Sequence, residues 1–168
     1  MSQQVINTGS VPNDNTGDTL RGSWTKANDN FTELYSLISA LNTATSYTPT
    51  VIDSGGGRTY TTTLNASRYT QIGNLRWFTV DLTVTAASGT ASGAFRVSLP
   101  ATSTYACAAE IYSDNLAAQA KTDVQVIIPA GASYAEVVHY ENGDANSVAA
   151  HVQATSRLVI TGLFFSAP

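Results

Sequence analysis

Trp77–Thr85 reads WFTVDLTVT, an alternation of apolar and polar residues that is typical of a β-strand with one buried face. More than half of these residues are valine or threonine, which favour extended structure. In an antiparallel sheet one face packs on the core while the other meets solvent, and this arrangement produces such a pattern. We therefore expect an antiparallel strand with Phe78, Val80, Leu82 and Val84 facing the core and Thr79, Asp81, Thr83 and Thr85 facing outward.

Similar short segments continue to the end of the chain and are separated by turn signals such as Ser88-Gly89 and Pro129-Ala130-Gly131. Short strands at this spacing indicate a sandwich, a jelly roll or a barrel. We predict that residues 47–168 form a mainly β domain, an antiparallel β-sandwich of the jelly-roll type. The other candidate strands are Thr59–Leu64, Tyr69–Ile72, Ala94–Leu99, Tyr105–Tyr112, Asp123–Ile128, Tyr134–Tyr140, Ser147–Gln153 and Arg157–Phe165.

The periodicity differs before residue 45, where apolar residues recur at alternating steps of four and three. This is the a/d pattern of a coiled coil. It predicts an α-helix capped by Asp18, and a boundary that separates residues 1–46 from residues 47–168. The apolar stripe, which we predict to be the oligomerisation surface, consists of Leu20, Trp24, Ala27, Phe31, Leu34, Ile38 and Leu41.

Such a stripe must be covered, either by the β domain of the same chain or by copies of the helix. The strict 3.5-residue repeat is narrower than the face of a helix that lies on a sheet, so self-association is the favoured interpretation. Trp24 and Phe31 are bulky for the core of a two-stranded coiled coil, and we expect a homotrimeric stalk. Docking of the helix in cis is the alternative.

Composition excludes several classes of partner. Eight lysines and arginines against twelve aspartates and glutamates give a net charge of −4, so the chain lacks the basic field that nucleic-acid binding requires. The first residues do not form a secretion signal, and no apolar run is long enough for a transmembrane helix. We expect a chain that folds in a cytosol and does not insert into a membrane. The single cysteine, Cys107, excludes an intrachain disulfide.

Patterns that carry catalysis or bind metal are scarce. His139 and His151 lie in predicted strands and have neither HxH nor HExxH spacing. The sequence has no Gly-x-Ser-x-Gly elbow, and Gly55–Gly57 lack the Lys-Ser/Thr of a phosphate-binding loop. We expect no enzymatic activity, no metal site and no cofactor. A small depolymerase that uses paired carboxylates is the least favoured alternative.

Tyrosines offer the remaining binding chemistry, because aromatic rings beside hydroxyls and amides can stack on sugars. All but one of the eight tyrosines lie in the predicted β domain. Exposed members would suit glycan contact, while the others would belong to the core. These tyrosines are Tyr47, Tyr60, Tyr69, Tyr105, Tyr112, Tyr134 and Tyr140.

The N-terminal sequence resembles a motif found near the start of many structural proteins of tailed bacteriophages, chiefly tail fibres and related appendages. The resemblance covers Ile6–Gly9, Pro12–Arg21 and Lys26–Tyr35. The family usually has glycine where this chain has Asn15, and asparagine also tolerates the left-handed backbone region that such a turn uses. A second, weaker resemblance, to a β-rich module at the ends of phage fibres and spikes, includes Ser67–Asn74 and Trp77–Val80.

These resemblances imply a virion protein of the phage tail, assembled in the host cytoplasm, commonly trimeric, with an N-terminal attachment region and an outward-facing C-terminal domain. Residues of the motif would bind other phage tail or virion proteins: Asn13, Asp14, Gly17, Asp18 and Arg21. Our first hypothesis is a trimeric tail fibre or appendage whose β domain binds the host surface, with glycan as the possible partner. The alternative is an architectural virion protein, such as an adaptor, collar or decoration piece, without receptor binding.

Overall fold

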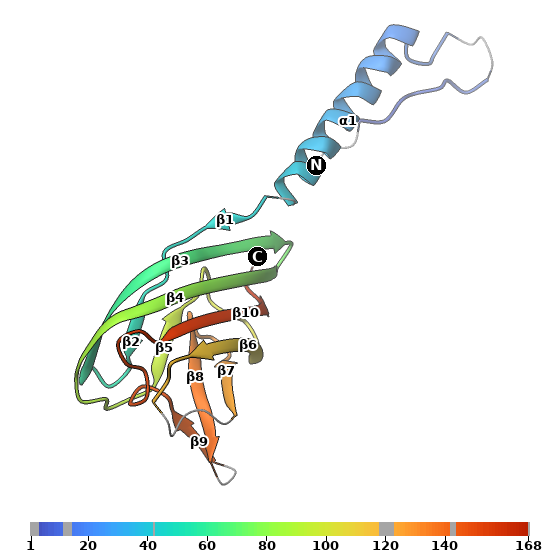
Figure 1. Cartoon of the computed structure of the whole chain (residues 1–168). Coiled ribbons are helices and arrows are strands. Elements are labelled where there is room, and N and C mark those ends of the chain that lie inside the picture. The colour runs from blue at the N-terminus through green and yellow to red at the C-terminus, as the bar shows by residue number, and fades with distance from the viewer. Residues whose placement is uncertain (1–3, 12–14, 42, 118–122, 142–143, 168) are drawn as a thin grey trace. The chain divides into compact units, whose positions relative to one another are not determined.

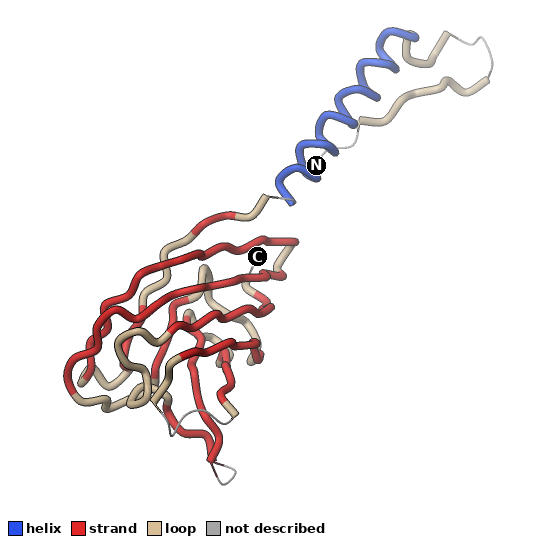
Figure 2. Tube along the Cα trace, viewed as in Figure 1, coloured by secondary structure: helices blue, strands red, loops and turns tan. Residues whose placement is uncertain are grey.

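The computed structural model describes residues 4–11, 15–41, 43–117, 123–141 and 144–167. Contacts between residues divide the chain into two compact units, Met1–Thr43 and Ala44–Pro168. Within the described residues, the first unit contains the helix α1 and the second contains the strands β1 to β10 (Figure 1 and Figure 2).

α1 spans Leu20–Leu41, which confirms the helix that the apolar spacing predicts. Thr19 is its N-cap residue: the Thr19 Oγ1 accepts a hydrogen bond from the backbone N–H of Gly22 at 3.1 Å, and the Thr19 carbonyl accepts one from Ser23 at 2.9 Å. The prediction of Asp18 as the cap is therefore wrong by one residue. The Asp18 carboxylate binds other groups instead, as described below.

The second unit is built on one antiparallel sheet with the strand order β1-β3-β4-β10-β6-β7-β8-β5-β2, and β9 pairs with β8. The sheet curls, because β2 at one end of this order lies beside β3 near the other end. Figure 1 shows the long strands β3 and β4 bending along the unit. The strands are β1 (Thr45–Ser46), β2 (Val51–Asp53), β3 (Arg58–Ile72), β4 (Leu75–Gly89), β5 (Phe95–Ser98), β6 (Cys107–Asp114), β7 (Val124–Ile128), β8 (Tyr134–Glu141), β9 (Asp144–Ser147) and β10 (Arg157–Phe165).

The inner face of the curled sheet forms the hydrophobic core. On β4 the buried side chains are Phe78, Val80, Leu82 and Val84, which confirms the two-residue alternation predicted from the sequence. The Phe78 ring packs edge-on against Phe164 of β10, with 5.8 Å between ring centroids. Other buried core residues include Phe95, Val97, Val126, Ile128, Ala135, Val137, Leu158 and Ile160.

The long strand β3 differs from its prediction as two strands, Thr59–Leu64 and Tyr69–Ile72. One continuous strand pairs with β4, and its register shifts between Thr61 and Thr62 and again between Leu64 and Ala66. These irregularities are β-bulges, which interrupt the alternation of buried and exposed side chains without ending the strand. The sequence pattern therefore looks broken where the backbone is continuous.

The jelly-roll sandwich is not confirmed, because the ten strands belong to a single hydrogen-bonded sheet rather than to two facing sheets. The predicted strand Ser147–Gln153 is wrong: β9 ends at Ser147, and the next residues form turns. Val148, Ala149 and Val152 of these turns are buried. Apolar residues that face the core from a tight turn therefore give a sequence pattern like that of a short strand. The short edge strands β1 and β2 are additional to the predicted set.

Candidate functional site

The predicted oligomerisation residues form an exposed stripe along α1. The exposed fractions are 77% for Leu20, 63% for Trp24 and 57% for Phe31. Leu34 and Ile38 are 44% and 43% exposed, while Ala27 and Leu41 are half-buried. Large apolar side chains arranged in this way need a partner surface, because leaving them in water is unfavourable.

The segment that precedes the helix lies along a different side of α1. Gln4 and Asn30 are joined by two hydrogen bonds. The Gln4 backbone N–H donates to the Asn30 side-chain oxygen at 2.9 Å, and the Asn30 side-chain amide donates to the Gln4 backbone carbonyl at 3.0 Å. Lys26 Nζ donates to the Val5 carbonyl at 3.0 Å. At about 100° per residue, Lys26 and Asn30 lie away from the centre of the apolar stripe. The N-terminal segment therefore covers a polar side of the helix and leaves the stripe exposed.

Asp18 holds the other end of this segment. Its carboxylate accepts a hydrogen bond from the Asn7 N–H at 2.8 Å and forms an ion pair with Lys26 Nζ at 2.7 Å. The Asp18 N–H donates to the Asn7 carbonyl at 2.8 Å. The hydrogen bond from Lys26, followed by the one from Asn7, lowers the pKa of Asp18 below its ordinary value of 3.8. Asp18 is thus a structural link within the first unit.

The other predicted attachment residues lie in or beside the same turn. Gly17 is tightly packed, because a Cβ at this position would lie 3.0 Å from the Asn7 carbonyl oxygen. Arg21 is exposed on the first turn of α1. Asn13 and Asp14 lie outside the described residues. Asn15 has a φ of 56°, the left-handed conformation expected of a residue that replaces glycine in this turn.

Asn7, Lys26 and Asn30 belong to this arrangement but were not among the predicted site residues. They are part of the quoted phage motif, and Lys26 and Asn30 are four residues apart on a helix, which places them on one side. That spacing indicates a polar contact surface. It does not reveal that the partner of this surface is the N-terminal segment of the same chain.

Titratable groups in the second unit do not gather into a catalytic cluster among the described residues. His139 is buried, and its ring meets the His151 ring edge-on with 5.1 Å between centroids. In the part of the chain that the structure describes, no group of three or more histidine, cysteine, aspartate or glutamate residues could hold a metal ion. Cys107 is half-buried, and its Sγ donates to the Tyr105 carbonyl at 3.2 Å. None of the described helices has the length and apolar character needed to cross a bilayer.

The tyrosines divide into packed and exposed groups. Tyr60 packs edge-on against Phe95, and its hydroxyl donates to the Ala149 carbonyl at 2.8 Å. Burial raises the pKa of Tyr47 and of Tyr60 to about 12. Tyr105 and Tyr112 are exposed, so they are the tyrosines of the sheet unit most open to an external partner among those described.

Two solved structures of phage proteins are similar to this chain. The tailspike protein gp208 of Dettilon is 16% identical with a TM-score of 0.58, and the likeness covers 73% of this chain and 23% of the tailspike. The receptor-binding protein gp15 of Listeria phage PSA is 17% identical with a TM-score of 0.53, and the likeness covers 92% of this chain and 83% of gp15. At these identities the similarity shows the fold, and this chain spans only about a quarter of the tailspike. No curated protein sequence matches the chain.

A family model matches residues 3–138, from the N-terminal phage motif through most of the strands of the sheet. Its description is "Bacteriophage T4 gp9/10-like protein, N-terminal". The match covers most of the chain and confirms the resemblance to phage tail proteins that the N-terminal residues carry. The chain therefore belongs to the bacteriophage T4 gp9/10-like protein family.

Proposed function

We propose that this protein is a trimeric tail fibre or tail appendage whose sheet unit binds glycan on the host cell surface. The observation that carries the proposal is the exposed apolar stripe of α1 in a chain of a phage protein family. The helix supplies the self-association surface, the sheet unit supplies the host contact, and the N-terminal turn supplies the attachment to other virion proteins. This role requires no catalytic step, metal or cofactor.

Self-association is supported by the two different sides of α1, a polar side that contacts the N-terminal segment and an apolar side that is exposed. Most helical stability in proteins comes from packing of an apolar face rather than from helix propensity, so α1 depends on packing. The N-terminal segment contributes polar contacts at Lys26 and Asn30, while Leu34 and Ile38 remain exposed. A parallel trimer would bury the a/d stripe and accommodate the bulky Trp24 and Phe31 at its core.

Host contact is supported by the valency of a trimer and by the folds of the similar proteins. One of them is described as a receptor-binding protein and the other as a tailspike. Three sheet units joined by one stalk would bind repeated surface sugars far more tightly than one unit, because linked sites act at a high effective concentration. A weak single site is therefore sufficient for firm attachment.

Mass measurement by light scattering tests the trimer directly. We expect the wild-type protein to have three times the mass of the chain, and Leu34→Asp or Ile38→Asp to reduce the mass to that of one chain while strand content is retained. Thr32→Asp is the matched control, since it adds the same charge at an exposed position outside the stripe. A monomeric wild-type protein would contradict the proposal, as would unfolding of the sheet in the stripe variants.

Retention on host cells tests the second half of the proposal. We expect the wild-type protein to sediment with cells of a strain that the phage infects, and soluble surface glycan from that strain to release it. A trimer that is not retained by these cells would instead be an architectural virion protein, such as an adaptor, collar or decoration piece.

A further inference from the structure

The outward face of the sheet carries a row of polar side chains that crosses five strands. Ser46 of β1 pairs with Arg68 of β3, and Arg68 pairs with Thr79 of β4. Thr79 pairs with Thr161 of β10, which pairs with Glu110 of β6. Directly paired residues project from the same face of a sheet, so these five side chains lie side by side. The alternate residues of β4 and β10 are buried, which places the polar row on the outside.

An aromatic and aliphatic row lies next to the polar row on the same face. Trp77 of β4 pairs with Thr70 of β3 on one side and with Leu163 of β10 on the other. The exposed fractions are 49% for Trp77 and 51% for Leu163. Along its own strand, each of Trp77, Thr70 and Leu163 is two residues from a member of the polar row. Residues two apart on a strand point to the same face, so one edge of this surface is polar and the other is apolar.

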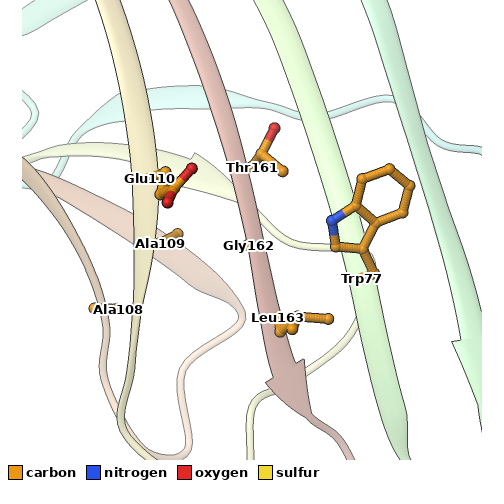
Figure 3. A pocket seen from close by; sticks show the side chains of 7 residues that line it. All are labelled: Trp77, Ala108, Ala109, Glu110, Thr161, Gly162 and Leu163. Atoms are coloured by element: carbon orange, nitrogen blue, oxygen red, sulfur yellow. The ribbon is translucent and has the colours of Figure 1, made fainter.

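Three neighbouring hollows lie along these rows. The first, of about 390 Å³, is lined by Trp77, Ala108, Glu110, Thr161 and Leu163, with Ala109 and Gly162 between them. Figure 3 shows the Trp77 indole on one side of this hollow and the Glu110 carboxylate on the other. Ala108 is small, and its short side chain leaves the space beside Leu163 open.

The second hollow, of about 320 Å³, lies on the β3 side of Trp77 and is also lined by Arg68, Thr70 and Thr79. The third, of about 370 Å³, shares Arg68 and Ala66 with the second and extends to Ser46. Trp77 lines the first and second hollows, and Ala66 and Arg68 line the second and third, so the three hollows follow one another across β6, β10, β4, β3 and β1. We call this series of hollows the groove. Four strand spacings of about 4.8 Å give this groove a length of about 19 Å.

The groove has the chemistry of a site for sugars. A pyranose ring presents an apolar face of C–H groups and a rim of hydroxyls, and the Trp77 ring next to a polar row matches both. The Thr79 and Thr161 hydroxyls lie 3.2 Å apart and can each donate or accept. Arg68 on β3 can donate and Glu110 on β6 can accept, and one charge of each sign leaves the groove without net charge. A groove without net charge favours an uncharged glycan over a polyanion.

We infer that this groove binds a linear, uncharged oligosaccharide, with one sugar stacked on Trp77 and its neighbours in the hollows on either side. The inference rests on the proposed function and names its binding surface. Hollows on both sides of one indole fit a chain of several sugars rather than a single ring, because the chain continues from one hollow to the next.

Fluorescence offers a direct test, because the chain has two tryptophans and Trp24→Phe leaves Trp77 as the only one. Since Trp24 belongs to the apolar stripe, light scattering first checks that this variant keeps the wild-type mass. The labelled full-length protein is first applied to an array of bacterial surface oligosaccharides, both neutral and anionic. We expect binding to neutral linear glycans, and a change in Trp77 emission when the bound oligosaccharide is titrated into the Trp24→Phe protein. Binding confined to anionic glycans, or unchanged Trp77 emission with a bound glycan, would overturn the inference.

Two variants locate the site. Trp77→Ala removes the stacking surface and Ala108→Gln fills the first hollow, and we expect each to weaken glycan binding about tenfold or more, as loss of a central aromatic contact does. Tyr112→Ala is the matched control, because Tyr112 is an exposed aromatic residue that lines none of the three hollows and should bind as wild type. Circular dichroism checks folding, and Ala108→Gln keeps the test decisive if Trp77→Ala unfolds.

The outcomes separate the groove from the general function. If the wild-type protein and both groove variants bind glycan and cells equally, the groove is wrong while host attachment stands. If wild-type protein binds neither cells nor any glycan, host attachment itself fails, and the groove fails with it. A groove variant with wild-type glycan affinity but a lower mass in solution would show that this face is a contact between copies of the chain.

Discussion

The Lys26 ammonium lies 2.7 Å from the Asp18 carboxylate and donates at the same time to the Val5 carbonyl at 3.0 Å. One side chain of α1 therefore joins Asp18, two residues before the helix, to the segment at the start of the described chain. Asn7 completes the connection through its two backbone bonds to Asp18. The N-terminal segment and the helix are thus one folding unit. Polar contacts on another side of α1 hold this unit together and leave the apolar stripe of α1 exposed.

Asp18→Asn tests this link. The substitution removes the negative charge that attracts Lys26 and replaces a charge-assisted acceptor with a neutral amide, which binds the Asn7 N–H less strongly. We expect the Asn7 amide to exchange with solvent several times faster, while amides in the centre of α1 keep their protection. Hydrogen exchange measured by NMR gives both values in one experiment.

Asp29→Asn is the control for Asp18→Asn, because Asp29 accepts only a side-chain hydrogen bond from Gln4 among the contacts described for it. Its effect should be confined to Gln4. Equal exchange at Asn7 in Asp18→Asn and in the wild-type protein would show that the carboxylate does not hold the segment.

The same carboxylate makes attachment of the N-terminal segment dependent on pH. The pKa of Asp18 is lowered below 3.8 in the folded protein, chiefly by the hydrogen bond from Lys26. A lowered carboxyl pKa contributes stability above the unfolded pKa, and this contribution disappears as the pH falls through the folded value. We expect the Asn7 amide resonance to be constant from neutral pH down to about 4. It should then shift toward its unfolded position below that pH, and Asp18→Asn should abolish this transition.

Local periodicity was sufficient to predict the helix and the central strand. Steps of four and three predict α1, and the alternation from Phe78 to Val84 predicts which side chains of β4 are buried. Both patterns arise from residues close together in the sequence, where each side chain's direction follows from the repeat of the backbone. The phage motif similarly predicts a turn at Asn15, where the backbone has positive φ.

Features that depend on pairing between strands far apart in the sequence could not be predicted. The single curled sheet requires β4 and β6 to flank β10, and local alternation does not specify strand neighbours. The β-bulges of β3 interrupt the alternation, so that one strand has the sequence pattern of two. The turn after β9 has buried apolar residues, so that its sequence pattern resembles that of a strand. The outward groove was missed for the same reason: Arg68, Thr161 and Glu110 become neighbours only through the strand register.

Gly162 has a packing role on the inner face of the sheet, although its backbone also lines the first hollow. A Cβ at this position would lie 2.5 Å from the Ala109 Cβ and 3.1 Å from Cε1 of Phe78. We expect Gly162→Ala to lower the free energy of unfolding by about 1 to 3 kcal/mol, the usual cost of overpacking a core. Thermal unfolding followed by circular dichroism should show a melting temperature several degrees below that of the wild-type protein.

A compensating substitution makes the Gly162 prediction specific. Ala109→Gly removes the nearest clashing atom, so the double variant Gly162→Ala/Ala109→Gly should be more stable than the sum of the two single changes allows. The two residues are in contact, and such pairs show coupling in a double-mutant cycle. Strict additivity would indicate that backbone movement, rather than the Ala109 Cβ, absorbs the added methyl group.

The packed tyrosines predict how the sheet unit responds to alkali. Burial raises the pKa of both Tyr47 and Tyr60 to about 12, so their neutral hydroxyls are favoured by the folded state. A raised pKa contributes stability that is fully present below the unfolded value of about 10 and is lost as the pH rises through the folded value. Absorbance at the phenolate band should therefore show a transition near pH 12 that belongs to these two tyrosines. Tyr47→Phe and Tyr60→Phe should each reduce the amplitude of this transition by one tyrosine. If Tyr60→Phe left this transition unchanged, the Tyr60 ring would be more accessible than its contact with Phe95 indicates, and the sheet would open at that edge before it unfolds.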